Sequence, residues 1–363
     1  MLVNRSFKMK SINFSKRELL RYVGDAEQVF GIKDYILSGG KAKGVRAFDI
    51  RNGSGLEFTV LADRGLDIAA MSVHGINCSY RSKTGIVAPE YYEESVHGFL
   101  RSFSAGFLTT CGLRNVGNPC REAEETFGQH GRISSIPGEE VGAKTEWMEG
   151  IPVFTVSGKM REARVFGEHL VFHRKISCRY GENRIRIQNT VENMGFKSEQ
   201  VMVLFHFNLG YPLLDEGAIL LTSTKRLIPR DPEAVKGEAS FSRCQKPTPG
   251  YAEQVFYHNL RSDEAGNTCA ALINPDREIG VAIHFNKKQL FNFTQWKQMG
   301  EGEYVMGMEP CNCYVGGRTD PRNEGIVEYL EPGEVRNFDL TIDVLSGRDE
   351  IAAITREIAG YRD

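Results

Sequence analysis

The segment Arg184–Asn193, RIRIQNTVEN, decides which class of fold the sequence can adopt. Ile185, Ile187 and Val191 fall on one side of it, and arginine, glutamine, threonine and glutamate side chains fall on the other. This period of two predicts a strand of an antiparallel sheet that has one face in water. Residues 201–209, VMVLFHFNL, are apolar at nearly every position, which predicts a strand that is buried on both faces.

Short runs of strand-forming residues are spread over the rest of the chain. They lie at residues 56–61, 151–156, 170–176, 270–273, 280–285 and 338–345. Helical periodicity is clear at residues 349–359, and residues 16–24 resemble a short helical turn. The pattern, with its 38 glycines, predicts a largely antiparallel all-β sandwich or barrel with a few short helices. The polar loop at 229–251 has strand signals on both sides, so we expect residues 1–363 to form one domain.

Composition excludes several classes of partner. The 45 basic and 47 acidic residues leave a net charge of −2, which gives no field to attract nucleic acid or an anionic membrane. No apolar run approaches the roughly 20 residues of a membrane span, and the amino-terminal residues lack the pattern of a secretion signal. Eight cysteines in so long a chain do not form a disulfide framework, so we expect their thiols to be reduced and the protein to be cytoplasmic. We expect a monomer or a homodimer.

Three segments carry candidate catalytic side chains. His130 lies in FGQHGRIS, where Gly131 permits backbone conformations that a Cβ would forbid. His206 lies within the apolar run LFHFNLG, where a lone histidine is more often a satisfied core residue. Glu309 lies in the apolar stretch MGMEPC, where a carboxylate must be paired, neutral or in a polar cleft. Two imidazoles and one carboxylate are the components of a general acid–base site.

Taken together, these segments resemble the galactose mutarotase (aldose 1-epimerase) superfamily. The resemblance is closest to the branch described as a domain of unknown function (DUF4432). It is carried by FLRSFSAGFLTTCGLRNVGNP, HGRIS, Trp296-Lys297, EYVMGMEPCNC, GGR and LEPGE, and it spans roughly residues 24–346. It implies a β-supersandwich with the site in a cleft on its concave face.

The resemblance also implies a reaction, which is the isomerisation of a sugar hemiacetal by ring opening and reclosure. His206 would be the general acid at the ring oxygen, and Glu309 the general base at the anomeric hydroxyl. His130 and Arg101 would hold ring oxygens of the carbohydrate. No metal and no organic cofactor is implied. Further candidates for substrate binding in the resembling segments are Arg132, Asn208, Trp296 and Lys297.

The sequence departs from the superfamily pattern in ways that bear on the substrate. Arg132 replaces a second glycine after the first histidine, and Lys297 and Arg318 also fall in resembling segments. We therefore expect a preference for an acidic sugar. The superfamily's sugar-binding aspartate has no clear counterpart, although Glu253 or His258 can substitute for it.

Two other functions remain open at this point. His130, His206 and Glu309 are also a two-histidine, one-carboxylate ligand set for a metal-dependent sugar isomerase. A non-catalytic carbohydrate-binding protein is the second alternative, with Trp296 as a stacking surface. Such a binder needs no acid and base, so the presence of both His206 and Glu309 favours an enzyme.

Overall fold

The computed structural model describes residues 15–94 and 96–362. The expectation about a secretion signal concerns residues 1–20, of which residues 1–14 lie outside the described residues. The alternation at Arg184–Asn193 forms β14, whose Ile185, Ile187 and Val191 are buried. The prediction of a mostly antiparallel all-β fold is confirmed, because every pairing between neighbouring strands of the three large sheets is antiparallel.

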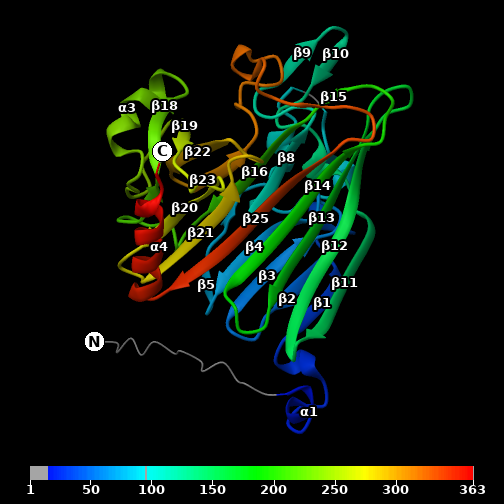
Figure 1. Ribbon diagram of the computed structural model, residues 1–363, viewed down its shortest axis with the longest axis vertical. Helices are drawn as coiled ribbons and strands as arrows, with labels where there is room; N and C mark the ends of the chain where they lie inside the picture. The colour runs from blue at the N-terminus through cyan, green and yellow to red at the C-terminus, as the bar shows by residue number, and fades with distance from the viewer. Residues whose placement is uncertain (1–14, 95, 363) are drawn as a thin grey trace.

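The sheet that contains β14 has eight strands, seen from its open face in Figure 1. In spatial order they are β11 (Glu139–Met148), β12 (Ile151–Ala163), β13 (His169–Arg179), β14 (Arg184–Asn193), β25 (Val335–Ser346), β21 (Ile279–Asn286), β20 (Asn267–Asn274) and β17 (Ile219–Thr222). These strands account for every strand predicted between residues 151 and 345 except the apolar run at 201–209. That run belongs to a second sheet.

The second sheet has six strands and holds the candidate site. Its order is β18 (Thr224–Pro229), β19 (Gln254–Leu260), β22 (Asn292–Gly300), β23 (Glu303–Cys311), β16 (Met202–Leu209) and β8 (Leu108–Leu113). All eight residues of β16 are buried, as the apolar run predicted. Strands β18 and β19 pair with each other, so the polar loop at 229–251 leaves the sheet and returns to the adjacent strand.

Five strands near the amino terminus make a third sheet, and three strand pairs complete the β structure. The five are β1 (Gly31–Ile36), β2 (Arg46–Arg51), β3 (Leu56–Leu61), β4 (Asp67–Val73) and β5 (Ile76–Asn77). The pairs are β6 (Tyr80–Arg81) with β7 (Ala105–Gly106), β9 (Cys120–Glu122) with β10 (Glu125–Phe127), and β15 (Glu199–Gln200) with β24 (Tyr329–Leu330).

Helices are short and lie at the margins of the sheets. They are α1 (Lys16–Leu19), α2 (Phe99–Ser102), α3 (Pro232–Gly237) and α4 (Arg348–Gly360), with 3₁₀ turns η1 (Ala26–Gln28), η2 (Gly40–Ala42), η3 (Pro89–Tyr91), η4 (Ile133–Ser135), η5 (Glu238–Ser240) and η6 (Pro321–Asn323). The helix predicted at 349–359 is α4, which packs Ile354 and Ile358 against the eight-stranded sheet. Among the described residues, no helix has the length and apolar character needed to cross a membrane.

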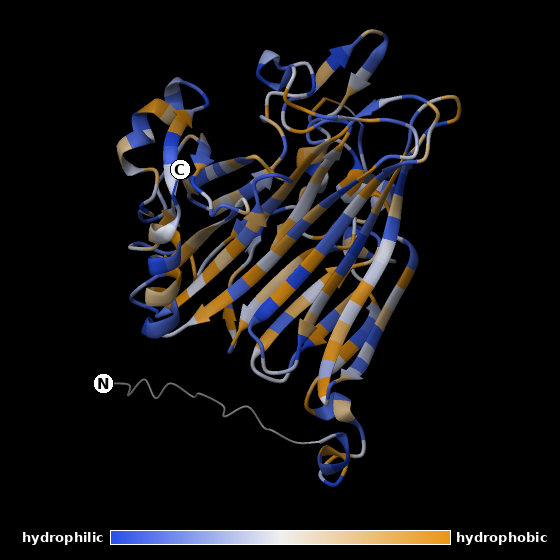
Figure 2. Ribbon diagram, viewed as in Figure 1, coloured by the Kyte–Doolittle hydropathy of each residue, from blue (hydrophilic) through white to orange (hydrophobic). Residues whose placement is uncertain are grey.

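The inner faces of the three sheets meet in one apolar core, and one buried ion pair ties them together. Arg174 of β13 donates from Nη1 to Oδ1 of Asp67 on β4 at 2.6 Å, and from Nη2 to the hydroxyl of Thr110 on β8 at 2.7 Å. Asn189 of β14 accepts the Arg174 Nε–H at 2.8 Å. The guanidinium therefore links strands from all three sheets. Figure 2 shows apolar and polar residues alternating along the strands of the eight-stranded sheet.

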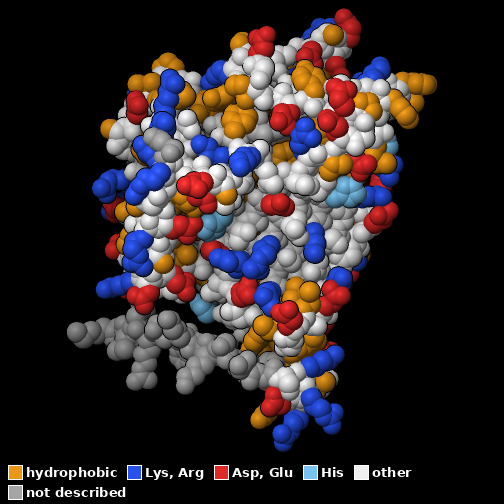
Figure 3. All heavy atoms as spheres, viewed as in Figure 1, with side chains coloured by type: hydrophobic (Ala, Val, Ile, Leu, Met, Phe, Trp, Pro, Cys, Tyr) orange, Lys and Arg blue, Asp and Glu red, His pale blue; other side chains and the backbone are white. Residues whose placement is uncertain are grey.

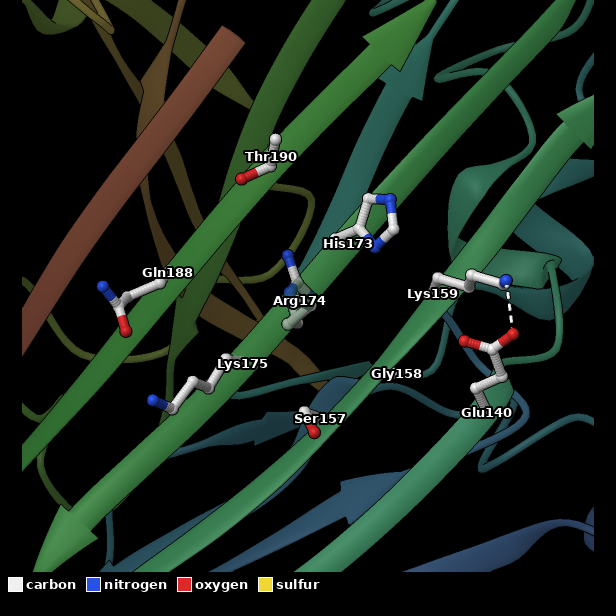
Figure 4. A pocket seen from close by; sticks show the side chains of 9 residues that line it. All are labelled: Glu140, Ser157, Gly158, Lys159, His173, Arg174, Lys175, Gln188 and Thr190. Carbon is white, nitrogen blue, oxygen red and sulfur yellow. Dashed lines mark hydrogen bonds and ion pairs between the residues drawn. The ribbon is translucent and has the colours of Figure 1, made fainter. Parts of the chain in front are cut away.

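The open face of the eight-stranded sheet has a shallow polar hollow of about 390 Å³ (Figures 3 and 4). The register of β12, β13 and β14 sets out two rows of side chains there, Lys159, His173 and Thr190 in one row and Ser157, Lys175 and Gln188 in the other. Lys159 also bonds Glu140 at 2.6 Å, which Figure 4 marks. These side chains form the water-facing surface of an antiparallel sheet.

Candidate active site

The pairing of β16 with β23 brings together two of the candidate catalytic residues. Leu204 pairs with Cys311 and Phe207 with Met308, and the same register sets His206 opposite Glu309. Nε2 of His206 lies 3.2 Å from Oε1 of Glu309. Both side chains are nearly buried, with 7% and 3% of their surfaces exposed. Two residues separated by about a hundred positions in the chain thus form one close pair.

A glycine makes room for the carboxyl group of Glu309. Gly307 lies two residues earlier on β23, so it faces the same side of the sheet. A Cβ at Gly307 would lie 2.4 Å from Oε1 of Glu309 and 2.8 Å from Cβ of Trp296. The carboxyl group therefore occupies the space that a side chain at 307 would fill. Sequence reasoning did not single out this glycine, although its place two residues before a glutamate in a strand was a usable signal.

Burial dominates the electrostatics of the pair. It raises the pKa of the Glu309 carboxyl well above its usual range, and the nearby Glu253 carboxylate adds to this effect while Arg230 opposes it. Burial also lowers the pKa of the His206 imidazole well below its usual range, and His130 acts in the same direction. Both changes favour the neutral forms, so at rest the carboxyl group is protonated and the imidazole carries a single N–H proton.

His130 is presented to the pair by a loop between β10 and η4. Its backbone has φ 58°, and the next residue, Gly131, has φ +68° with a Cβ position only 2.2 Å from the carbonyl oxygen of Gly112. The backbone N–H of Gly117 donates to Nδ1 of His130 at 3.3 Å. The proton of the neutral ring is therefore on Nε2. Burial lowers the pKa of His130 to about 4, so this imidazole is a neutral donor near pH 7.

Aromatic rings form the walls around His206. Phe103, which follows α2, lies 5.3 Å from the His206 ring, and Trp296 of β22 lies 5.4 Å from it, centroid to centroid. The ring of His130 lies 5.9 Å from His206 and 4.9 Å from Phe99. Flat apolar faces next to a few polar atoms are the usual surroundings of a small polar ligand in a pocket.

The rim of the pocket carries a fixed chain of polar contacts. Nε1 of Trp296 donates to Oε2 of Glu253 at 2.8 Å. Arg230 donates from Nη2 to Oε1 of the same glutamate at 3.0 Å and from Nε to Asp231 at 2.7 Å. These contacts hold the indole ring in place and put a carboxylate at the pocket entrance. Arg230 was not identified from the sequence because it lies in the long loop at 229–251.

The resulting pocket has a volume of about 150 Å³, which suits one small molecule such as a single sugar ring. Its described lining consists of Phe99, Leu100, Phe103, Gly117, Asn118, Gln129, His130, His206, Arg230, Glu253, Val255, Thr294, Trp296, Glu309 and Val315. Four of the residues predicted from the sequence are among them, namely His130, His206, Trp296 and Glu309.

The other predicted substrate-binding residues are placed elsewhere. Arg101 is on the outward side of α2, with 72% of its side chain exposed and an ion pair to Glu93 at 3.3 Å. Arg132 is paired with Glu94 outside the lining. Lys297 follows Trp296 on β22, so it faces the opposite side of the sheet. There its Nζ donates to the carbonyl oxygen of Ser240 at 2.8 Å.

Three further residues from the sequence analysis have structural contacts. Arg318 donates from Nε to Glu122 at 2.8 Å, which fastens the β9–β10 hairpin. His258 is fully buried between Thr224 and Gln295, at 2.8 and 3.1 Å, outside the pocket lining. Asn208 is fully buried beside His206 and also lies outside the lining. Of the two proposed counterparts of the aspartate, Glu253 is thus the one at the pocket.

Within the described part of the chain, no group of three or more histidine, cysteine, aspartate or glutamate side chains is placed to hold a metal ion. His130, His206 and Glu309 accordingly do not form such a group. All eight cysteines lie in this part of the chain and are free thiols. A metal-dependent isomerase therefore lacks a supporting donor set.

A known protein family and several solved structures are similar to this chain. The model of the family described as a domain of unknown function (DUF4432) matches residues 42–344. The chain belongs to the DUF4432 family. This family assignment confirms the resemblance from the sequence, and no curated protein matches the chain.

Solved structures similar to this DUF4432 chain share its sandwich. A Klebsiella pneumoniae protein, provisionally named an aldose 1-epimerase, is 26% identical with a TM-score of 0.88, covering 92% of this chain and 88% of that one. A galactose mutarotase-like protein from Clostridium acetobutylicum is 12% identical with a TM-score of 0.65, covering 88% and 99%. Galactose 1-epimerase from Lactobacillus acidophilus is 14% identical with a TM-score of 0.55, covering 88% and 100%. The galactose mutarotase-like fold is thereby established.

Proposed function

We propose that this DUF4432 protein is an aldose 1-epimerase-like isomerase that interconverts the two anomers of a sugar. The observation that carries the proposal is the 3.2 Å contact between Nε2 of His206 and Oε1 of Glu309 in an aromatic-walled pocket. A hemiacetal has its ring oxygen and its anomeric hydroxyl on the same carbon. An acid and a base that serve those two oxygens must therefore be neighbours, which these two residues are.

In the proposed reaction His206 gives the Nε2 proton to the ring oxygen while Glu309 takes the proton of the anomeric hydroxyl. The bond between C1 and the ring oxygen breaks, and C1 becomes an aldehyde carbon. Rotation about the C1–C2 bond and reversal of both proton transfers deliver the other anomer. His130 contributes an Nε2–H donor to a sugar oxygen, and Trp296 supports one face of the ring. General acid–base catalysis of this kind contributes about 10²–10⁴-fold.

The pKa changes are compatible with this assignment because the pair needs no proton from solvent. A neutral carboxyl next to a neutral imidazole holds the same number of protons as a carboxylate next to an imidazolium. Nε2 and Oε1 lie 3.2 Å apart, and once the substrate complex brings them into line, transfer of one proton between them converts the first form into the reactive form. Each catalytic cycle returns the pair to its starting proton count.

The charge of the sugar is a separate proposal. The sequence predicted an acidic sugar from Arg132, Lys297 and Arg318, but these side chains are engaged with Glu94, the Ser240 carbonyl and Glu122, away from the pocket. Of the residues described as lining the pocket, Arg230 and Glu253 have opposite charges and bond each other. The lining thus offers no free cation, and we infer a neutral aldose as substrate.

Exchange NMR of anomeric protons over a panel of neutral and acidic aldoses tests both statements. We expect faster exchange with at least one neutral sugar and a loss of about 10²–10⁴-fold in Glu309→Gln. Acceleration restricted to uronic acids would refute the neutral preference. No acceleration with any sugar, in protein that still binds one, would refute the isomerase and favour a carbohydrate-binding protein.

Glu162→Gln is a matched control for the glutamate substitution. Glu162 is also a nearly buried glutamate whose pKa is raised by burial, and it accepts the Leu113 backbone N–H at 3.0 Å. A glutamine oxygen can accept the same hydrogen bond. Because Glu162 lies outside the pocket lining, exchange should continue at the wild-type rate. Equal losses in both variants would attribute the effect of Glu309→Gln to folding.

A further inference from the structure

Three buried polar atoms in the site lack a hydrogen-bond partner among the described residues. They are Nδ1 of His206, Oδ1 of Asn208 and Oε1 of Glu309. Oε1 lies 3.2 Å from Nε2 of His206 but off the line of a hydrogen bond. An orphaned polar atom inside a protein costs free energy, so the presence of three in one site calls for a functional explanation.

The first two orphans belong to neighbouring side chains, although no hydrogen bond joins them in the structure. His206 and Asn208 are two residues apart on β16, so their side chains stand next to each other on the same face. The Asn208 amide is turned back toward His206, since Nδ2 donates to the His206 carbonyl oxygen at 2.8 Å. Fixing Nδ2 in this way leaves Oδ1 as a free acceptor beside an imidazole whose Nδ1 is also free. Asn208 is fully buried, so its side chain has no contact with bulk water.

We propose that Asn208 is a positioning residue, whose Oδ1 accepts a hydrogen bond from Nδ1–H of His206 and so reserves Nε2 for proton exchange. This inference rests on the proposed function and changes the sequence-based role of Asn208 from sugar binding to support of the acid. Asn208 is fully buried and does not line the pocket, which supports a positioning role over sugar binding.

The proposed bond has two consequences for the acid–base pair. With Nδ1 permanently protonated, the neutral ring presents a lone pair at Nε2 to the carboxyl of Glu309, and the charged ring presents an Nε2–H to the sugar. The Asn208 side chain also favours the charged imidazole, and thus opposes the lowering of the His206 pKa by burial. The opposite tautomer would place the lone pair on Nδ1, away from both Glu309 and the pocket.

Nitrogen NMR reads the tautomer without reference to any substrate. In protein labelled with ¹⁵N-histidine, the His206 signals are assigned by their loss in His206→Gln. We expect a protonated Nδ1 and an unprotonated Nε2 at neutral pH in the wild type, and a mixture of tautomers in Asn208→Ala. A wild-type ring protonated at Nε2 would overturn the proposal, even if the alanine variant failed to fold.

Kinetics on the sugar found by the exchange assay provide the second readout. Asn208→Ala should lower kcat by about 10–100-fold, as the loss of a hydrogen bond that orients a histidine does at metal sites, with KM changed less than about threefold. Asn208→Asp should preserve the Nδ1–H tautomer and most of kcat while moving the pH profile upward, because a carboxylate stabilises the imidazolium more strongly. A change in KM alone would return Asn208 to sugar binding and overturn the positioning role.

The two readouts separate this inference from the proposed function. If His206 has the expected tautomer but the protein accelerates anomeric exchange of no sugar, the isomerase is refuted and the Asn208 contact is not. Normal mutarotation with the wrong tautomer, or with a tautomer that Asn208→Ala leaves unchanged, would refute the positioning role alone. Asn189→Ala, which removes a buried asparagine bonded to Arg174, controls for the loss of any buried amide.

Discussion

Replacing Gly307 by alanine is the sharpest structural test of the site. The new Cβ would lie 2.4 Å from Oε1 of Glu309 and 2.8 Å from Cβ of Trp296, both below any normal van der Waals contact. Cβ of Trp296 is fixed to the backbone of β22, so that contact is relieved only if the paired strands shift apart, whereas the Glu309 carboxyl, at the end of a flexible side chain, turns away. Its displacement breaks the 3.2 Å contact with His206, on which coupled proton transfer depends.

The expected effect is large on activity and moderate on stability. Loss of general acid–base catalysis costs about 10²–10⁴-fold, which corresponds to about 3–5 kcal/mol in the activation free energy. The backbone of Gly307 is not in the left-handed region, so alanine brings no conformational strain there. Overpacking costs about 1–3 kcal/mol, and the stiffer unfolded chain returns about 0.4–1 kcal/mol of this. Anomeric exchange NMR and denaturant unfolding measure the two effects.

Gly280→Ala is the matched control for this substitution. Gly280 is also a strand glycine, on β21, and its Cβ would lie 3.0 Å from side-chain atoms of Ile273 and Leu345, remote from the pocket lining. We expect a comparable loss of stability with wild-type exchange. If Gly307→Ala kept its activity within about threefold of wild type, the reasoning that places the carboxyl over Gly307 would be refuted.

Three further predictions concern residues outside the pocket. Arg101→Ala should leave anomeric exchange within about twofold of wild type, because Arg101 is exposed and pairs with Glu93; a loss above tenfold in KM would restore it to sugar binding. Arg174→Met should lower the free energy of unfolding by about 3–5 kcal/mol, because it strands the buried carboxylate of Asp67, and unchanged denaturation would contradict this. Burial lowers the pKa of His258 to about 4, so between about pH 6.5 and 4 the unfolded chain binds more protons than the folded one, and the free energy of unfolding falls as the pH falls. His258→Gln should reduce this pH dependence by up to about 1.4 kcal/mol per pH unit, which unfolding measured at several pH values would show.

The sheet structure was predictable because its information is local. Alternation in β14 and the apolar run in β16 are properties of consecutive residues, and both strands lie where those patterns placed them. The helix at the carboxyl end needed only its own periodicity and differs from α4 by one residue at each end. A prediction of this kind requires no knowledge of which strands are neighbours.

The site was less predictable because it depends on register and on the facing of each strand. Trp296 and Lys297 are adjacent in the sequence, yet they face opposite sides of β22, and only the pairing with β23 decides which side holds the pocket. Arg101 was assigned to the site by its motif, but on one turn of helix it points outward while Phe99 points inward. Arg230 reaches the pocket rim only because the chain leaves β18 and returns to the adjacent strand β19.

The proposed acid and base lie on two hydrogen-bonded strands inside a six-stranded sheet, whereas other parts of the pocket lining come from α2, the loop bearing His130 and the β18–β19 connection. Strand positions tolerate little change, because a shift of one residue would turn each side chain to the other face. Loops tolerate insertion and substitution. Substitutions in the loops can therefore change which ligand the pocket accepts without moving the His206–Glu309 pair. Substrate preference can thus diverge among proteins with this architecture while the proposed reaction stays the same.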